Sequence, residues 1–252
     1  MNSEVITVAT HEEGLFKELI NNNFNIKVKV LGFGEKWTGF KMKFELVYNY
    51  IKDLPDDKII IFLDGFDSKI NGNLDKAVDK FLKKESKIIF SKDAPWHSYG
   101  LEKMVFPSYK NNIIINCGMY IGYVKYLKIL LHEMLKQKCN DDQVIVNKIS
   151  KNYDFIDVDE NEDIFKNIYN TRNFNDEMKK SDAIFFSQPG TLTFNRISRS
   201  IVEYGQFFIP YILLLYTIKM YLYFKSKKIY RIIAITIILI IFLFIIDKSC
   251  IL

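Results

Sequence analysis

Two carboxylates that follow a strongly apolar segment are the residues of this chain best placed to do chemistry. Residues 58–63 read Lys-Ile-Ile-Ile-Phe-Leu, which is typical of a strand buried on both faces. Asp64 ends this segment, Gly65 allows a tight turn, and Asp67 follows three residues after Asp64. Because open α/β sheets bind ligands outside the carboxyl ends of their strands, two hard oxygen donors there predict a Mg²⁺ or Mn²⁺ site that can hold a diphosphate. The alternative is a turn with two solvated aspartates.

A regular alternation of strand and helix patterns surrounds this segment. We expect strands at 4–10, 26–31, 58–63, 87–91, 113–116, 155–158 and 183–186, and helices at 15–20, 40–52, 74–82, 123–138 and 144–150. The connection between the last two strands is mostly polar. This order of elements predicts an α/β domain with a largely parallel central sheet.

The charge of the chain is concentrated at its C-terminal end. The 252 residues carry 35 Lys and Arg and 30 Asp and Glu; six of the basic residues and one acid lie in 207–252, which leaves 29 of each sign in 1–206. The predicted domain 1–206 is therefore formally neutral, and the net charge of +5 belongs to the tail. This distribution favours a membrane surface as partner and argues against nucleic acid.

The C-terminal tail, residues 207–252, contains a segment long enough to cross a membrane. Residues 232–246 are fifteen in a row without a charged side chain, and the span 229–246 extends this run to 18 residues around Arg231. About 17 apolar residues is the minimum that crosses a bilayer, and an arginine near the end of a span can reach the interface. We therefore expect 229–246 to be transmembrane, with a buried core helix or an interfacial helix as the alternatives.

A second apolar segment, residues 207–224, precedes a short basic stretch in the tail. It contains Pro210 and Lys219, and it is either interfacial or transmembrane. With one crossing, the basic residues 225–228 and the domain stay in the cytosol, in agreement with an N-terminus that lacks the features of a signal peptide. With two crossings, the domain and the C-terminus lie together across the membrane, so the sequence leaves the side open.

Six short motifs occur in an order that resembles a known family. They read Val-Ala-Thr at 8–10, Leu-Gly-Phe-Gly-Glu-Lys-Trp at 31–37, Lys41, Ile-Ile-Phe-Leu-Asp-Gly-Phe-Asp at 60–67, Asn-Cys-Gly-Met-Tyr-Ile-Gly at 116–122 and Asn-Asp-Asp-Gln at 140–143. Together they resemble the glycosyltransferase domain of the procollagen lysyl hydroxylase and collagen glucosyl/galactosyltransferase (PLOD-like) family. The resemblance implies a Rossmann-like GT-A fold and transfer of glucose or galactose from a UDP-sugar with Mn²⁺. It also implies a hydroxyl acceptor, such as (galactosyl)hydroxylysine in collagen-like protein.

The resemblance assigns roles in donor binding to residues of each motif. Asp64 and Asp67 match the metal-binding pair of the family. The positions that match donor contacts are Thr10, Trp37, Lys41, Phe66, Asn116, Gly118, Gln143 and Gly190. A tryptophan beside a glycine-rich loop can stack on a uracil, and a lysine near a diphosphate offsets the charge of the leaving group. Taken alone, Trp37 could equally pack in the core and Lys41 could be solvated.

Two adjacent carboxylates are the candidates for catalysis. Asp141 and Asp142 match the acidic run of the family, which is shortened here to two residues before Gln143. Such a carboxylate can deprotonate the acceptor hydroxyl or stabilise positive charge at the anomeric carbon of the sugar. Without the resemblance, capping of a helix explains both residues equally well. Trp96 matches an aromatic residue in a loop of the family. The resemblance implies that this residue forms a platform for the acceptor or the sugar.

One position departs from the family and keeps an alternative function open. The family places a third metal ligand, a histidine, just before a glycine late in the domain, where this chain has Ser187. A neutral hydroxyl is a poor substitute for imidazole on Mn²⁺. The first alternative is therefore a catalytically silent module that binds a nucleotide-sugar or a glycan at a membrane. A nucleotidyltransferase would share the metal pair but needs a basic triphosphate-binding loop, which residues 8–14 lack.

Overall fold

The computed structural model describes residues 2–94, 108–110, 112–139, 141–169 and 173–189, together with 212–219, 222–223 and 235–237. The chain divides into two compact units, Met1–Thr191 and Leu192–Leu252. The sequence-based boundary after residue 206 lies C-terminal to this division.

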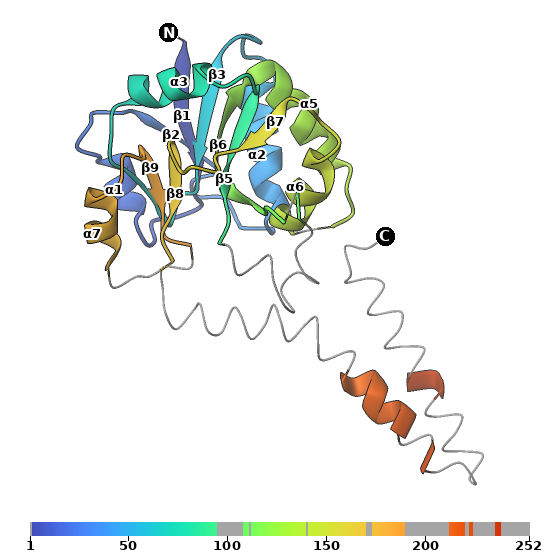
Figure 1. Ribbon diagram of the computed structural model, residues 1–252. Coiled ribbons are helices and arrows are strands. Elements are labelled where there is room, and N and C mark those ends of the chain that lie inside the picture. Colours follow the sequence, from blue (N-terminus) through green and yellow to red (C-terminus); the bar gives the residue numbers. More distant parts are fainter. Residues whose placement is uncertain are drawn as a thin grey trace. The chain divides into compact units, whose positions relative to one another are not determined.

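A six-stranded sheet forms the centre of the first unit (Figure 1). Its strands, in spatial order, are β2 (Val28–Leu31), β1 (Ser3–Val8), β3 (Ile59–Leu63), β6 (Ile115–Tyr123), β5 (Ile88–Lys92) and β7 (Ile156–Val158). β1 pairs in parallel with β2 and β3, and β5 pairs in parallel with β7, whereas β6 is antiparallel to both of its neighbours. The mixed α/β architecture and the mostly parallel sheet fit a Rossmann-like glycosyltransferase fold.

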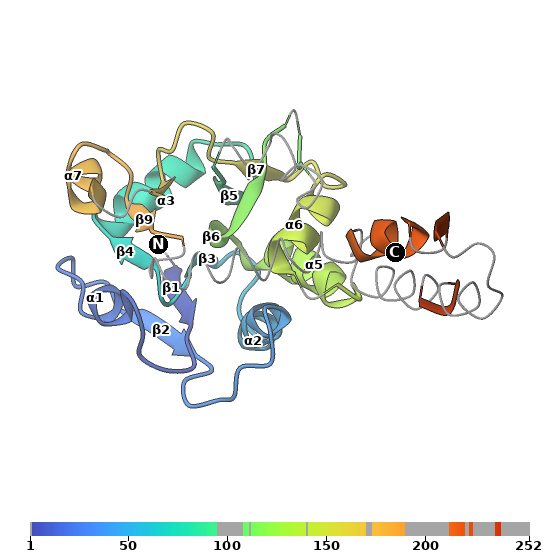
Figure 2. The same cartoon turned by 90° about the horizontal axis from the view of Figure 1, so that it is seen from below.

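Helices cover the two faces of this sheet (Figure 2). One face carries α2 (Lys41–Ile51), α5 (Val124–Leu135) and α6 (Asp142–Ser150), and the opposite face carries α1 (Phe16–Ile20) and α3 (Leu74–Leu82). The side chains of β3 alternate between the two cores: Ile60 and Phe62 pack with α2 and α5, while Ile59, Ile61 and Leu63 pack with α1 and α3. Because both faces of β3 are covered, its sequence is apolar at every position.

A second, three-stranded sheet lies on the α3 side and was not predicted as a sheet. It consists of β4 (Ser68–Ile70), β9 (Phe185–Ser187) and β8 (Phe165–Asn167), in that order. β9 pairs antiparallel with β4 and parallel with β8, and α7 (Phe174–Lys179) connects β8 to β9. β4 and β8 have only three residues each, which is too short for hydrophobic alternation to mark them, whereas β9 overlaps the strand predicted at 183–186.

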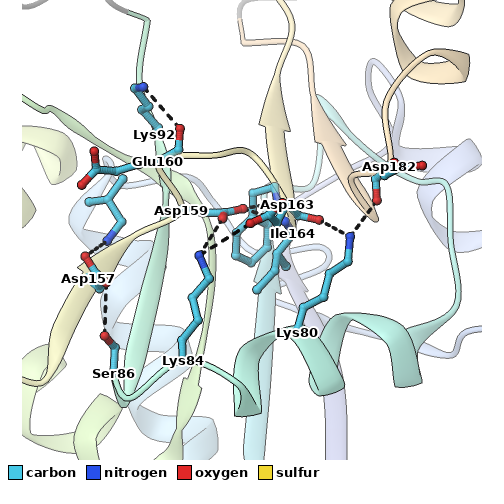
Figure 3. A network of polar contacts seen from close by, with 12 residues as sticks. Lys80, Lys84, Ser86, Lys92, Asp157, Asp159, Glu160, Asp163, Ile164 and Asp182 are labelled. Carbon is cyan, nitrogen blue, oxygen red and sulfur yellow. Dashed lines mark hydrogen bonds and ion pairs between the residues drawn. The ribbon is translucent and has the colours of Figure 1, made fainter.

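A buried aspartate fixes the connection between β7 and β8 (Figure 3). The carboxylate of Asp159 is fully buried and accepts hydrogen bonds from the backbone N–H groups of Ile164 and Phe165 at 2.6 and 2.9 Å. Lys84, just beyond α3, forms an ion pair with Asp159 at 3.2 Å, and Lys80 of α3 donates to two loop carbonyl oxygens at 2.8 and 3.0 Å. These contacts attach the small sheet to α3.

The second unit is described only at residues 212–219, 222–223 and 235–237, all of which are helical. Large apolar side chains are exposed along these residues, among them Ile212, Leu215 and Tyr223. Within these residues and the described part of the first unit, no helix is long and apolar enough to cross a membrane. Of the predicted spans, 8 of the 18 residues of 207–224 and 15 of the 18 residues of 229–246 lie outside the described residues.

Candidate active site

The direction of β6 brings two separate motifs together. Since β6 is antiparallel to β3, the middle of β6 lies beside the last residues of β3, where Leu63 pairs with Met119. The N–H of Asp64 donates to the carbonyl oxygen of Gly118 at 2.8 Å. Asn116 stays within β6 and accepts the N–H of Gly118 on its side-chain oxygen at 2.9 Å. Three residues predicted for metal and donor binding, Asp64, Asn116 and Gly118, are therefore neighbours.

Two glycines shape the space around Asp64. A Cβ atom at position 65 would lie 2.6 Å from the carbonyl oxygen of Val8, so Gly65 lets the turn after β3 pack against the end of β1. A Cβ atom at position 118 would lie 3.0 Å from Oδ1 of Asn116 and 3.5 Å from Oδ2 of Asp64. Gly118 thus allows the backbone of β6 to pass close to the side chains of Asn116 and Asp64.

A buried lysine connects Asp64 to the predicted catalytic pair. Lys43 of α2 forms an ion pair with Oδ2 of Asp142 and lies 3.3 Å from Oδ2 of Asp64. Its side chain is only 8% exposed, against 25% for Asp64 and 9% for Asp142. Burial alone lowers the pKa of Lys43, but the charges of Asp142 and Asp64 outweigh burial and hold this pKa well above its usual range. The site therefore contains a permanent internal cation.

Sequence reasoning selected a different lysine. Lys41 donates to the carbonyl oxygen of Gln137, just beyond α5, at 2.8 Å, whereas Lys43 contacts the carboxylates. Side chains two residues apart point to different sides of a helix, so the two lysines cannot share one role. The signal for Lys43 was its spacing of four residues from Val47, which lies on the buried face of α2.

The two aspartates at the start of α6 have different partners. Asp141 is the N-cap residue, and its Oδ1 accepts the N–H of Val144 at 2.9 Å. Asp142 is buried, with Oδ1 accepting the N–H of Gln143 at 3.0 Å and Oδ2 facing Lys43. Asp142 therefore contacts the lysine that joins it to Asp64, and Asp141 contacts the helix backbone.

Gln143 belongs to a series of side-chain hydrogen bonds with Asp93 and Tyr169 that the sequence did not predict. The Nε2 group of Gln143 donates to Oδ2 of Asp93 at 2.7 Å, and the hydroxyl of Tyr169 donates to Oδ1 of the same carboxylate. Burial, followed by the charge of Asp93, raises the pKa of Tyr169 well above its usual range. Asp93 is buried and follows β5 directly, as Asp64 follows β3, and this repeated position was the available signal in the sequence.

The segment of Ser187 lies next to Asp67. Ser187 pairs with Ser68 in the β4–β9 ladder, and the N–H of Gln188 donates to the carbonyl oxygen of Asp67 at 2.7 Å. Ser187 is 2% exposed. The position at which the family carries a histidine is thus beside the second carboxylate of the predicted metal pair.

The residues predicted to contact the nucleotide lie at the ends of β1 and β2. The carbonyl oxygen of Thr10 accepts the N–H of Gly34 at 2.9 Å, and its hydroxyl lies 2.9 Å from Nδ1 of His11. The ring of Phe66 lies 5.1 Å from the ring of His11. Trp37 packs edge-on against Phe40 with ring centroids 5.8 Å apart, yet it is 41% exposed. The indole of Trp37 is therefore partly accessible to solvent. Trp96 and Gly190 lie outside the described residues.

Asp64 and Asp67 form an incomplete set of protein ligands for a divalent metal. Among the described residues, no group of three or more His, Cys, Asp or Glu side chains is arranged to hold an ion. Asp64 and Asp67 are hard oxygen donors, and the side chain of Asp64 is 25% exposed, so a ligand can reach it from solvent. Mg²⁺ and similar ions commonly take one or two protein carboxylates and complete their coordination with substrate phosphates and water. The residues fit an ion of this kind that binds together with a diphosphate.

The chain is similar to a family of known proteins. Fold and site have the features of a Rossmann-like glycosyltransferase domain. The profile of the family described as PLOD GT domain matches residues 1–188, and the chain belongs to this family.

Three curated relatives illustrate the similarity. The chain is 30% identical over 160 residues to procollagen-lysine,2-oxoglutarate 5-dioxygenase 2 of Mus musculus, covering 58% of this chain and 21% of the relative. It is 31% identical over 161 residues to procollagen-lysine,2-oxoglutarate 5-dioxygenase of Drosophila melanogaster, covering 58% and 22%. It is 27% identical over 158 residues to the multifunctional procollagen lysine hydroxylase and glycosyltransferase LH3 of Homo sapiens, covering 58% and 21%. The match thus spans about a fifth of each relative.

A search of solved structures gives a distant likeness. The crystal structure of A197 from STIV aligns with a TM-score of 0.37 at 12% identity, covering 59% of this chain and 78% of that chain.

Proposed function

We propose that this protein is a metal-dependent glycosyltransferase that moves a hexose from a UDP-sugar to a hydroxyl acceptor. The observation that carries the proposal is the meeting of Asp64, Gly118 and Asp142 at the carboxyl end of β3, where Lys43 joins the two carboxylates. These residues come from three separate elements and belong to three of the motifs shared with the family. The family membership of residues 1–188 supports the reaction class.

The donor would bind along the ends of β1, β2 and β3. Asp64 and Asp67 would hold Mn²⁺ or Mg²⁺, and a bound metal supplies the positive charge that neutralises a diphosphate leaving group. The partly exposed indole of Trp37 offers a stacking surface for uracil, next to Thr10. Asn116 accepts the N–H of Gly118 on its side-chain oxygen, which fixes the backbone of β6 beside Asp64.

The acceptor end of the site would be formed by the start of α6. Asp142 would accept the proton of the acceptor hydroxyl or stabilise positive charge at the anomeric carbon. Asp141 fixes the first turn of α6, and Gln143 is held by Asp93. A relative is named a procollagen lysine hydroxylase and glycosyltransferase, so we propose (galactosyl)hydroxylysine in collagen-like protein as the acceptor and glucose or galactose as the sugar.

Donor release is the direct test. The full chain, kept in a mild detergent, would be incubated with Mn²⁺ and UDP-glucose or UDP-galactose, with and without a galactosyl-hydroxylysine peptide. We expect UDP release that the peptide stimulates and that Asp64→Asn/Asp67→Asn abolishes, while Lys128→Met, which removes a surface ion pair with Asp56, retains it. Release from only one donor would identify the sugar. A folded chain that neither binds nor cleaves either UDP-sugar would overturn the proposal.

A catalytically silent binding module is the second candidate, and Ser187 is the observation that favours it. Ser187 is buried beside Asp67 in the position of the histidine ligand of the family. Detectable binding of a UDP-sugar without release in the same assay would support this candidate. The variant Ser187→His would then be expected to tighten Mn²⁺ binding, because imidazole replaces a neutral hydroxyl as ligand.

We also propose that the tail attaches the protein to a membrane. The support is the uncharged run at 232–246, the basic residues at 225–228 and the exposed apolar side chains of residues 212–219. Extraction of cell membranes with alkaline carbonate tests the proposal. Retention of the chain in the membrane pellet is expected, and complete release into the supernatant would contradict it.

A further inference from the structure

The carboxylate of Asp64 already has a hydrogen-bond donor on each oxygen. Its Oδ1 accepts the N–H of Gly65 at 3.1 Å, and its Oδ2 accepts from the ammonium of Lys43 at 3.3 Å. Lys43 also binds Asp142, so one buried cation spans the end of β3 and the start of α6. Its ammonium lies 5.6 Å from the ring centroid of Phe40, and its side chain is 8% exposed. Lys43 is therefore held inside the protein and is not a surface lysine that swings into solvent.

A divalent cation at Asp64 has to share this environment with Lys43. Two like charges a few ångströms apart repel each other strongly in a partly buried site, where the effective dielectric constant is far below that of water. Oδ2 of Asp64, which Lys43 contacts at 3.3 Å, is the oxygen of this carboxylate that lies against Gly118, and a metal bound through Oδ2 would meet the ammonium there. Metal and ammonium therefore compete for one carboxylate oxygen.

We propose that Lys43 is a built-in counter-cation that competes with the divalent metal for Asp64 and transfers its charge to Asp142 when the metal binds. This inference rests on the metal pair of the proposed function. In the metal-free protein, the single charge of Lys43 offsets part of the repulsion between buried Asp142 and partly exposed Asp64. When a metal occupies Asp64, Lys43 remains paired with Asp142 alone and holds that carboxylate at the start of α6. Loading of the metal is thus linked to the placement of Asp142.

Affinity for Mn²⁺ alone tests the competition without any turnover. Free Mn²⁺ would be measured by electron paramagnetic resonance during titration of the full chain. Lys43→Met removes the competing charge, and we expect it to tighten Mn²⁺ binding about tenfold or more. Lys43→Arg keeps the charge and is expected to stay within about threefold of the wild type. Lys128→Met removes a lysine of α5 that pairs with Asp56 at 3.0 Å. It serves as the matched control, and we expect it to leave Mn²⁺ affinity unchanged.

Removal of the partner carboxylate should act in the opposite direction. In Asp142→Asn, the whole charge of Lys43 falls on Asp64, so Mn²⁺ binding is expected to weaken several-fold. The double variant Lys43→Met/Asp142→Asn should bind Mn²⁺ more tightly than Asp142→Asn. It also removes one charge of each sign, so it provides the comparison if Lys43→Met alone fails to fold. Weaker or unchanged binding on loss of Lys43, in both backgrounds, would overturn the inference.

The same set of variants separates this inference from the proposed function. If Mn²⁺ affinity changes as expected but no variant and no wild-type sample releases UDP, the counter-cation role stands and the transferase proposal fails. The inference fails and the transferase stands in two cases, in both of which the wild type transfers sugar. In the first, Lys43→Met leaves the Mn²⁺ affinity unchanged. In the second, neither the wild type nor Lys43→Met binds Mn²⁺. Circular dichroism and thermal melting of each variant show that the compared chains are folded.

Discussion

Asp141 and Asp142 begin α6 side by side, and their carboxylates meet different groups. The oxygen of Asp141 satisfies a backbone N–H that the first turn of a helix would otherwise leave without a partner. The oxygen of Asp142 faces an ammonium that also contacts the end of β3. Substitutions at the two positions should therefore be distinguishable by whether they change stability or turnover.

For this pair we expect Asp141→Ala to lower the free energy of unfolding by about 1 kcal/mol, because Ala cannot cap the helix. Asp141→Asn should recover most of that loss, since asparagine is also a good N-cap residue. Asp142→Asn should reduce kcat by about 10² or more if its carboxylate takes part in proton transfer. Urea unfolding and steady-state kinetics measure the two effects. Equal kcat for Asp142→Asn and wild type would remove Asp142 from the catalytic set.

Gly118 offers a second residue-scale test, because a methyl group there would occupy the space beside Asp64. The added Cβ would lie 3.0 Å from Oδ1 of Asn116 and 3.5 Å from Oδ2 of Asp64. We expect Gly118→Ala to raise the KM for UDP-sugar about tenfold and to cost about 1–3 kcal/mol of stability through overpacking. Gly72→Ala is the matched control, since its Cβ would lie 2.9 Å from Ile184 in the small-sheet region. A similar KM change in both variants would mean that the effect comes from lost stability.

At the scale of elements, the carboxylate of Glu4 connects β1, α2 and the residue before β3. Glu4 of β1 accepts hydrogen bonds from Lys58, just before β3, at 2.6 Å and from Tyr50 of α2 at 2.7 Å. Burial opposes ionisation of Glu4, but the contacts with Lys58 and Tyr50 outweigh it and hold the pKa of Glu4 below its usual value. Folding and ionisation of Glu4 therefore support each other.

The lowered pKa of Glu4 predicts a stability contribution that depends on pH. It is fully present above the pKa of Glu4 in the unfolded chain, about 4.3, and it is lost as the pH falls through the lower pKa of the folded chain. Glu4→Gln should thus reduce the free energy of unfolding by about 1 kcal/mol at pH 7 and by less at pH 3.5. Glu12→Gln, at an exposed pair with Lys17, should change little at either pH. A difference that grows toward acid would refute the assignment.

The connection between β7 and β8 gives a larger effect, because the carboxylate of Asp159 is fully buried. Asp159→Asn removes the partner of Lys84 and one acceptor for the N–H groups of Ile164 and Phe165. We expect a loss of about 3 kcal/mol or more in urea unfolding, in the range measured for broken buried ion pairs. Asp163, half exposed and 3.9 Å from Lys84, is the comparison, and Asp163→Asn should stay within about 0.5 kcal/mol of wild type. Equal losses would show that burial of Asp159 has no special role.

Elements with an apolar pattern were predictable from the sequence, including short ones such as β7 and β9, whereas β4 and β8 were not predicted and β6 was predicted too short. The helix predicted at 74–82 is α3, Leu74–Leu82, because its apolar spacing and the N-cap residue Asn73 agree. The strand predicted at 113–116 continues as β6 to Tyr123. Gly122 obscured it, although a Cβ there would lie only 2.9 Å from Ile88 of β5, so packing against the neighbouring strand favours glycine.

Site residues that lie at strand ends or in motifs were predictable from the sequence. Site residues that reach their positions through packing between distant segments were not. Asp64 and Gly118 come together because β6 is antiparallel to β3, a pairing that no local pattern specifies. Lys43 and Asp93 owe their positions to burial between elements far apart in the chain. Such residues become visible only once the topology is known.

At the scale of the whole molecule, the predicted domain 1–206 and the tail 207–252 differ in charge. Residues 1–206 carry equal numbers of acids and bases, while the tail carries the net charge of +5 and a basic stretch at 225–228. Each lysine near an anionic membrane surface contributes about 1 kcal/mol of attraction, and salt screens this attraction within a Debye length. Anionic lipid should therefore strengthen membrane attachment, beyond what the apolar run provides.

Co-flotation with lipid vesicles tests this two-part attachment. We expect the full chain to bind vesicles with 20–30% anionic lipid about tenfold or more tightly than neutral vesicles at low salt, and the difference to shrink at high salt. Lys225→Gln/Lys227→Gln/Lys228→Gln should remove most of the difference while leaving binding to neutral vesicles unchanged. The matched variant Lys76→Gln/Lys83→Gln/Lys87→Gln changes the same number of lysines in the first unit and should keep the preference for anionic lipid. Loss of the preference in that variant instead would place the membrane-binding charge on the first unit and not on the tail.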